Sequence, residues 1–207
     1  MSRLSSGPGA LPLEDSEAGR FGLYRLLGVA LSHPPTPQLL DALRILPTTD
    51  DSSLIGVALA NLARSGRAIA LEQAKRDYAT VFVGVARGEL VPYASFYLTG
   101  FLHDRPLARL REDLVRLGLE AAPSHPDPED HAGTLCELMA GFIDGAHGAT
   151  LPLDRQRDFF RRHLAPWIGN FFADLSALHY AALYRAIGAL GLAFIDVELH
   201  AFEMEIS

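Results

Sequence analysis

The densest group of side chains able to do chemistry lies in one short segment that holds His125, Asp127, Glu129, Asp130 and His131. Imidazole and carboxylate groups are both competent metal ligands. On a helix, however, ligands must share one face at a spacing of three or four residues. Asp127 and His131 meet that requirement, whereas Glu129 and Asp130 point elsewhere. A metal site therefore has weak support, and we expect none.

A helix N-terminus explains the same segment with fewer assumptions. Asp127 is a good N-cap residue, and Pro128 suits the first helical position. Glu129 and Asp130 would then lie near the positive end of the helix dipole. The dipole also disfavours a charged imidazole in the first turn, so we expect His131 to be a neutral hydrogen-bonding residue.

Other catalytic arrangements find little support along the chain. The sequence contains no phosphate-binding G-x-x-x-x-G-K-[ST] loop, no H-E-x-x-H and no G-x-S-x-G. His103 and Asp104 resemble the paired ligands of helical metal-dependent His-Asp phosphohydrolases, an alternative that would need further ligands such as His33, His163 or Asp174. None of these lies in a recognisable context, so we expect no catalytic residues.

The single cysteine, Cys136, excludes a disulfide within the chain and a zinc site built on thiolates. Its surroundings suggest a small buried hydrophobic residue in a helix. One cysteine without a bridge fits a reducing compartment. We therefore expect a cytoplasmic protein.

An irregular stretch over residues 84–104 carries the aromatic residues Tyr93, Phe96, Tyr97 and Phe101. Long ordered loops are often functional. These rings either pack the loop onto the core or form a recognition surface, because Tyr presents an apolar body with a polar tip. The sequence leaves both interpretations open.

Composition restricts the class of protein. The 207 residues carry a formal charge of −7, and 49% of them are hydrophobic. An acidic chain argues against nucleic-acid binding, which relies on Lys and Arg to neutralise phosphates. Residues 175–195 are apolar apart from Arg185 and a few polar groups, which favours a buried core helix over membrane insertion. We expect a disordered tail over residues 1–14 and one domain over 15–207.

Helical periodicity runs through nearly the whole domain. The pattern predicts an all-α fold, a single compact domain of roughly eight to ten helices, in which residues 81–85 form at most one short strand. The expected helices cover residues 21–32, 37–43 with Thr36 as cap, 50–64 with a stop near Gly66, 69–83, 106–117, 127–144, 154–164, 167–178 and 180–202.

Four segments, in this order, resemble the TorD/DmsD/NarJ family of redox-enzyme maturation chaperones. Residues 77–84 (DYATVFVG) are similar to its D-Y-x-x-L-F-x-G, and residues 92–98 (PYASFYL), followed by Pro106, to its aromatic segment and later proline. Residues 127–131 (DPEDH) resemble its E-P-x-D-H signature, with Asp in place of Glu. Residues 159–167 (FFRRHLAPW) resemble its F-x-x-H-L-x-P-W.

The resemblance implies an all-α protein without catalytic activity. Such chaperones bind the precursor of a molybdenum oxidoreductase, commonly through its twin-arginine leader peptide, and keep the apoenzyme competent for cofactor insertion. Some members form domain-swapped dimers, so a monomer or such a dimer is expected. GTP binding has been proposed in the family, but no motif for it is present here, and no cofactor is expected. The client enzyme stays open.

The resemblance and the residue chemistry together predict where a leader would bind. An apolar groove would supply most of the affinity, and the acidic corner would set the orientation of the leader. An unspecialised helical scaffold remains a further alternative. The predicted partner-binding residues are Tyr93, Ser95, Phe96, Tyr97, Leu98, Pro106, Asp127, Pro128, Glu129, Asp130 and His131.

Overall fold

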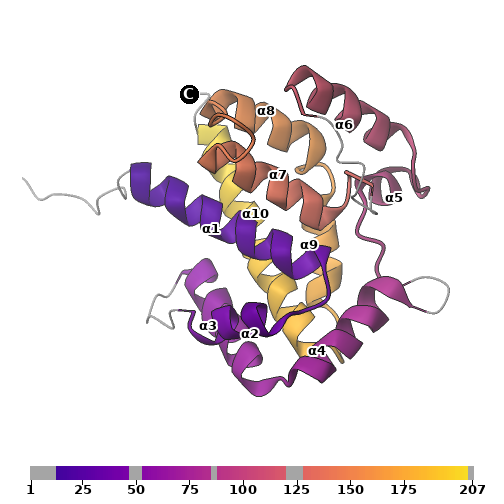
Figure 1. Cartoon of the computed structure of the whole chain (residues 1–207). Coiled ribbons are helices and arrows are strands. Elements are labelled where there is room, and N and C mark those ends of the chain that lie inside the picture. The colour runs from indigo at the N-terminus through magenta and orange to yellow at the C-terminus, as the bar shows by residue number, and fades with distance from the viewer. Residues whose placement is uncertain (1–12, 47–52, 85–87, 120–127, 205–207) are drawn as a thin grey trace, which may run out of the picture.

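A computed structural model describes residues 13–46, 53–84, 88–119 and 128–204 of the chain. Within these ranges the protein is all-α, which confirms the predicted fold class (Figure 1). The helices are α1 (Leu13–Ser32), α2 (Pro37–Arg44), α3 (Leu54–Ala68), α4 (Leu71–Tyr78), the π-helical η1 (Ala79–Val83), α5 (Ala94–Thr99), α6 (Arg105–Arg116), α7 (Ala132–Asp144), α8 (Leu153–His163), α9 (Ile168–Ser176) and α10 (Ala182–Met204).

Local signals set several helix ends where the sequence predicts them. Thr36 caps α2, because its Oγ1 accepts a hydrogen bond from the Leu39 N–H at 3.2 Å. Gly145, with φ of 79°, ends α7 in the left-handed conformation that glycine adopts without strain. Helix α1 begins at Leu13, two residues before the predicted domain boundary, and residues 1–12 lie outside the described part of the chain.

Two local predictions were wrong. Gly66 does not stop α3 but lies inside it, where a Cβ would come within 2.9 Å of the Leu43 Cβ, so the glycine allows α2 and α3 to approach closely. No strand forms in the described part of residues 81–85, in line with the all-α prediction, since η1 covers Ala79–Val83. The irregular stretch before α6 also contains a short helix, α5, which ends at Gly100.

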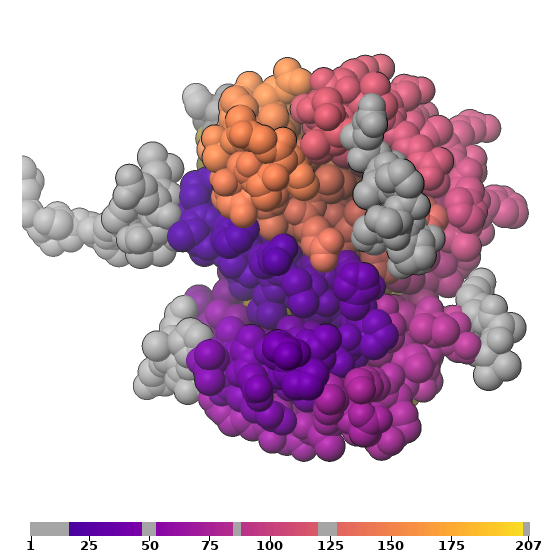
Figure 2. All heavy atoms as spheres, in the orientation of Figure 1, coloured from indigo at the N-terminus to yellow at the C-terminus, as the bar shows by residue number. Residues whose placement is uncertain are grey.

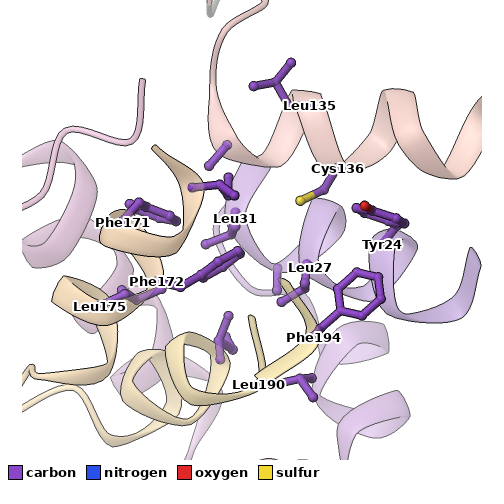
Figure 3. Close-up of a cluster of buried hydrophobic side chains, with 14 of the residues drawn as sticks. Tyr24, Leu27, Leu31, Leu135, Cys136, Phe171, Phe172, Leu175, Leu190 and Phe194 are labelled. Carbon is purple, nitrogen blue, oxygen red and sulfur yellow. The ribbon is translucent and has the colours of Figure 1, made fainter. Parts of the chain in front are cut away.

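The core lies between α1, α7, α9 and α10 (Figure 3). Helix α10 runs through the centre of the molecule, with α1 and α7 packed together on one side of it and α9 alongside (Figure 1). The rings of Tyr24 from α1 and Phe194 from α10 meet edge to face, with centroids 4.6 Å apart. Helices α5, α6 and α8 pack against this core.

The apolar stretch over residues 175–195 spans the end of α9, a short connection and the first part of α10, in agreement with the helices predicted over residues 167–178 and 180–202. Most of its side chains are buried in the core. Among the described residues, no single helix combines the length and apolar character needed to cross a membrane. Only α3 taken together with α4–η1 satisfies those criteria, and these two segments are bent by 115°.

Candidate functional site

The sequence predicts that a helix begins at Pro128, but Pro128, Glu129 and Asp130 form a turn, and α7 begins at Ala132. His131 has extended backbone angles and is the N-cap: its Nδ1 accepts a hydrogen bond from the Gly133 N–H at 3.1 Å. A nitrogen that accepts carries no proton, which agrees with the expected hydrogen-bonding role of a neutral ring. Asp127 lies outside the described residues.

Asp130 explains why the helix begins later. Its Oδ2 accepts a hydrogen bond from the Ser95 N–H at 2.8 Å, and its carbonyl accepts one from the Ala94 N–H at 3.0 Å. Helix α5 has no side-chain cap of its own. The carboxylate of Asp130, from a distant part of the chain, therefore takes the place of that cap. A helical turn at residues 128–131 would withdraw it from Ser95.

A further contact joins the same two segments. The Ala132 N–H donates to the Pro92 carbonyl at 2.8 Å, and the Tyr93 ring meets the His131 ring edge-on at 5.0 Å. Asp130 and His131 are only 1% and 4% exposed. In this structure the two residues hold α5 against the start of α7. The acidic corner predicted at Asp127, Glu129 and Asp130 is therefore not open to solvent at Asp130, whose carboxylate is buried.

Glu129 is also engaged within the chain. Its Oε2 lies 2.8 Å from an Arg111 guanidinium nitrogen of α6, and Arg111 Nε donates to the same oxygen at 2.9 Å. The Glu129 side chain is 14% exposed and that of Arg111 is 54% exposed. Arg111 is thus the exposed partner of a carboxylate that is itself largely shielded from water.

Most of the aromatic residues pack the α5 segment onto the core. The Tyr97 ring lies 5.4 Å from the Trp167 ring and 6.0 Å from the Phe171 ring, and its hydroxyl donates to Asp174 Oδ2 at 2.8 Å. Burial, and then the hydrogen bond to Asp174, raise the pKa of Tyr97 above its usual value, so the hydroxyl stays a donor. Phe96 is half-buried beside Tyr97.

An exposed apolar patch follows directly. Leu98, Phe101 and Leu102 are 44%, 71% and 45% exposed, and we call these three residues the α5–α6 patch. The turn that carries them is built by Gly100, with φ of 82°, and by His103, with φ of 61°. Sequence reasoning named Leu98 and did not assign Phe101 or Leu102 to the site. In the sequence, Phe101 and Leu102 could have been assigned to the site only from their apolar character at the end of the aromatic segment.

A cavity of about 230 Å³ lies beside this patch, between α5, α6, α7 and α8. Three of the predicted site residues, Leu98, Pro106 and Asp130, contribute to its wall. Asp130 Oδ1 is buried and has no hydrogen-bond partner within the described ranges. The lining residues are Ala94, Leu98, Pro106, Arg109, Leu110, Glu112, Asp113, Arg116, Asp130, Leu135, Arg162 and His163.

The structure does not bring the remaining predicted residues into this cavity. Those with described positions, which pack behind the wall or lie beside it, are Tyr93, Ser95, Phe96, Tyr97, Pro128, Glu129 and His131. Ser95 is a fully buried residue of α5, and its backbone N–H is the group that donates to Asp130. Some of the predicted residues thus line the cavity, and the others pack behind or beside it.

Asp113 links α6 to α8 at the polar end of the cavity. Its Oδ2 lies 2.9 Å from His163 Nε2 and accepts a hydrogen bond from Arg162 at 2.7 Å, while its Oδ1 accepts one from Arg116 at 2.6 Å. Burial alone would raise the pKa of Asp113, but the hydrogen bonds from His163, Arg162 and Arg116 outweigh burial and lower it. Burial lowers the pKa of His163, against the opposing effect of Asp113.

The His103–Asp104 pair has a local explanation. Asp104 is the N-cap of α6, where its Oδ1 accepts a hydrogen bond from the Arg105 N–H at 2.7 Å. His103 is exposed at the turn. Across the described ranges, no three His, Cys, Asp or Glu side chains converge in an arrangement that could hold a metal ion. Cys136 is fully buried in α7, as expected, and burial raises the pKa of its thiol.

Comparisons with known proteins agree with the fold and with the motifs. A family model described as nitrate reductase delta subunit matches residues 49–173. The chaperone protein TorD of Vibrio cholerae serotype O1 is 31% identical over 134 residues, which cover 61% of this chain and 61% of that protein. The chaperone protein TorD of Shewanella pealeana is 25% identical over 162 residues, covering 74% and 71% of the two chains.

A solved structure shows the same fold. It is described as a putative redox enzyme maturation protein from Archaeoglobus fulgidus, and it superposes with a TM-score of 0.53 at 18% identity, covering 94% of this chain and 99% of that one. The likeness to that structure concerns the fold. The family match spans more than half of the chain, so this protein belongs to the nitrate reductase delta subunit family, the TorD/DmsD/NarJ group that its motifs resemble.

Proposed function

We propose that this protein is a cytoplasmic chaperone, without catalytic activity, that binds the precursor of a molybdenum oxidoreductase before cofactor insertion. The observation that carries the proposal is family membership, together with relatives that are named chaperone proteins. The ligand is the twin-arginine leader of the precursor, the mature apoenzyme, or both. The protein acts as a monomer or a domain-swapped dimer, and no cofactor is part of the proposal.

The leader contacts the α5–α6 patch with its apolar stretch. Leu98, Phe101 and Leu102 expose apolar surface next to a cavity whose wall includes Leu98 and Pro106. Burial of apolar surface contributes roughly 25 cal/mol per Å², so a few hundred Å² supplies several kcal/mol before ordering costs. Exposed ion pairs supply about 0.2–1 kcal/mol each. The patch therefore determines the affinity.

The leader's arginines need a carboxylate, and Glu129 is the best placed member of the signature. Asp130 is buried and already accepts from Ser95. Glu129 pairs with Arg111, whose side chain is 54% exposed. A leader arginine takes the place of Arg111 on Glu129, and Asp130 and His131 contribute by keeping α5 in position.

Calorimetric titration with synthetic leader peptides tests this proposal. The panel covers leaders of an N- or S-oxide reductase, a nitrate reductase and a formate dehydrogenase from the native cell. Phe101→Ala should weaken binding of the cognate leader about tenfold or more, since burial of a large apolar side chain contributes roughly 1.5–3 kcal/mol. Val197→Ala, at an apolar residue of α10 that is 46% exposed, is the control and should bind normally.

The exchange at Glu129 has its own test. Arg111→Gln should strengthen leader binding a few-fold, because Glu129 no longer has to release a partner, and Glu129→Gln should weaken it. Arg64→Gln, which changes an exposed arginine of α3, serves as control. If no leader in the panel binds and no molybdoenzyme precursor is recovered with the protein from its native cell, the proposed function is wrong.

A further inference from the structure

Two cavities follow one another along the junction of α6 and α8. The first cavity, of about 230 Å³, is the one beside the α5–α6 patch, and the second, of about 140 Å³, lies further along both helices. The two helices are side by side at the top of the molecule (Figure 2). The second cavity is lined by Asp113, Arg116, Leu117, Arg155, Asp158, Phe159 and Arg162.

Three charged side chains belong to the walls of both cavities, namely Asp113, Arg116 and Arg162. Asp113 Oδ1 accepts a hydrogen bond from Arg116 at 2.6 Å. Its Oδ2 accepts one from Arg162 at 2.7 Å and lies 2.9 Å from His163 Nε2. We call these four residues the Asp113 cluster. Because the cluster joins α6 to α8 in the shared wall, it separates one cavity from the other.

The cluster combines one shielded contact with two that are open to water. The His163 side chain is 7% exposed, whereas those of Arg116 and Arg162 are 65% and 60% exposed. A carboxylate only accepts, so His163 Nε2 carries the hydrogen of the shielded contact. Water competes for the two guanidinium groups, and exposed ion pairs of this kind are weak. The position of both arginines at the boundary therefore depends on Asp113, their common acceptor.

The two arginines can leave the boundary without disturbing the core. A long Arg side chain at an exposed position reaches solvent by rotating about its own bonds. Helix α6 is held on the core by Leu107, Leu110 and Leu114, which are 2%, 1% and 5% exposed. The boundary between the cavities can therefore open while the helices stay in place.

Apolar side chains lie on both sides of this boundary. Leu110 and Leu135 line the first cavity, and Leu117 and Phe159 line the second. Each cavity is smaller than the roughly 300–1,000 Å³ of typical ligand pockets, and together they reach that range. Opening of the Asp113 cluster would thus join two small apolar spaces into one groove of ordinary size for a ligand.

We infer that the Asp113 cluster determines how far an apolar segment of the client extends along α6 and α8. With the cluster closed, the segment occupies the first cavity, which shares Leu98 with the α5–α6 patch. When Arg116 and Arg162 turn into solvent, the segment continues into the second cavity. The inference rests on the proposed function, and it makes Asp113 a positioning residue that acts through the two arginines.

Asp113→Asn tests the inference in calorimetric titrations with the cognate leader. The amide keeps the size of the side chain but removes the charge that holds the two arginines, so the open state becomes more populated. A ligand that needs a minor state binds more tightly as that state becomes populated. The variant should bind the full leader about threefold or more tightly. A leader that lacks the second half of its apolar stretch should gain less than about twofold.

Asp41→Asn is the matched control, because it removes a carboxylate from an arginine pair on α2, which lines neither cavity. It should leave the affinity for both leaders unchanged. A residue that only supported the fold would weaken binding when replaced, so a gain in affinity identifies the positioning role. If Asp113→Asn does not fold, Arg116→Gln with Arg162→Gln opens the same boundary and should give the same gain.

A neutral apolar dye probes the cavities without the leader. Nile red fluoresces on apolar surface, and its lack of charge makes it insensitive to the loss of a carboxylate. The joined groove in Asp113→Asn should bind the dye more tightly than the unaltered protein does, and Asp41→Asn should not differ from the unaltered protein. Far-UV circular dichroism and cooperative urea unfolding establish that each variant is folded.

Three results would overturn the inference. The first is full-leader affinity that is unchanged or lower in a folded Asp113→Asn, and the second is an equal gain for the full and the shortened leader. The third is unchanged dye binding in that variant. If no leader binds the unaltered protein while the dye binds Asp113→Asn more tightly, the proposed function fails and the separation of the cavities by Asp113 is supported.

Discussion

Asp130 Oδ2 accepts the backbone N–H of Ser95 at 2.8 Å, across 35 residues of chain. Through this bond a signature residue that looks like a ligand contact becomes the N-terminal cap of a helix elsewhere in the chain. The bond places Leu98 and the α5–α6 patch relative to α7. Asp130 of the signature therefore fixes the position of α5.

Replacing Asp130 should reduce stability and binding together. Asp130→Ala removes the acceptor of a buried N–H, so the free energy of unfolding in urea should fall by about 1–3 kcal/mol. Leader affinity should fall as well, because α5 loses its anchor. Asp41→Ala, at an exposed carboxylate paired with Arg44, is the control and should cost less than about 1 kcal/mol. Unchanged stability with lost binding would instead make Asp130 a direct ligand contact.

The lowered pKa values of Asp113 and of the buried His163 predict that acid destabilises the protein. Both groups have folded pKa values below their usual ones, so in each case the unfolded state binds protons more readily. Stability therefore rises with pH over the range in which each group titrates. The His163 contribution is complete above its usual pKa of 6.5 and declines as pH falls below that value. Asp113 adds a further loss as pH falls below its usual pKa of 3.8.

His163→Gln isolates the first of these steps. Urea unfolding measured between about pH 7 and pH 5, where an unperturbed His changes charge, should show a smaller slope of stability against pH in the variant. His200→Gln, at an exposed histidine of α10 whose pKa is raised by its hydrogen bond to the Asp196 carbonyl, is the comparison. The His200→Gln variant should keep the loss of stability below pH 6.5 that protonation of His163 produces. Identical slopes in His163→Gln and the unaltered protein would contradict the assignment.

A buried ion pair links α1, at the start of the domain, to α10, at its end. Glu198 of α10 is 1% exposed and accepts hydrogen bonds from Arg20 Nε at 2.7 Å, Arg20 Nη2 at 3.0 Å and the Tyr24 hydroxyl at 2.8 Å. Glu198→Ala removes the buried carboxylate that pairs with Arg20, which keeps its contacts with Glu17 and Gln156. The unfolding free energy should therefore fall by less than the roughly 3–5 kcal/mol that a fully unpaired buried charge costs. Tyr24→Phe should cost about 1 kcal/mol. A loss below 1 kcal/mol for Glu198→Ala would mean that the pair is open to water.

Two glycines give a matched test of the contact between α1 and α7. A Cβ at Gly133 would lie 2.4 Å from Ser32 Oγ and 2.8 Å from the Ser32 backbone nitrogen, so Gly133→Ala should destabilise by about 1–3 kcal/mol. A Cβ at Gly22 meets nothing within 4 Å, so Gly22→Ala should stabilise α1 by about 0.5–1 kcal/mol. Thermal melts of both variants test this contact. Equal shifts in melting temperature would contradict the close packing of α1 against α7 at Gly133.

Much of the helical framework could be predicted because its signals are local. Thr36 before Pro37 marks a helix start, and Gly145 marks a helix end, since both depend on backbone groups within a few residues. The motifs at residues 77–84, 92–98, 127–131 and 159–167 also indicated the family, which the comparisons confirm. Binding of the leader by the predicted residues remains a prediction.

The start of α7 and the burial of the signature could not be predicted. Residues 127–131 contain several residues that can cap a helix, and local propensity favours the first of them. His131 becomes the cap because Asp130 bonds to Ser95 and Ala132 bonds to Pro92, contacts between segments far apart in sequence. The same holds for Gly66, whose role depends on α2 lying against α3. Periodicity and composition determined which segments are helical, because those signals lie within each segment. The choice among competing caps, and the burial of Asp130, were decided by tertiary contacts that complete hydrogen bonds no single segment can satisfy.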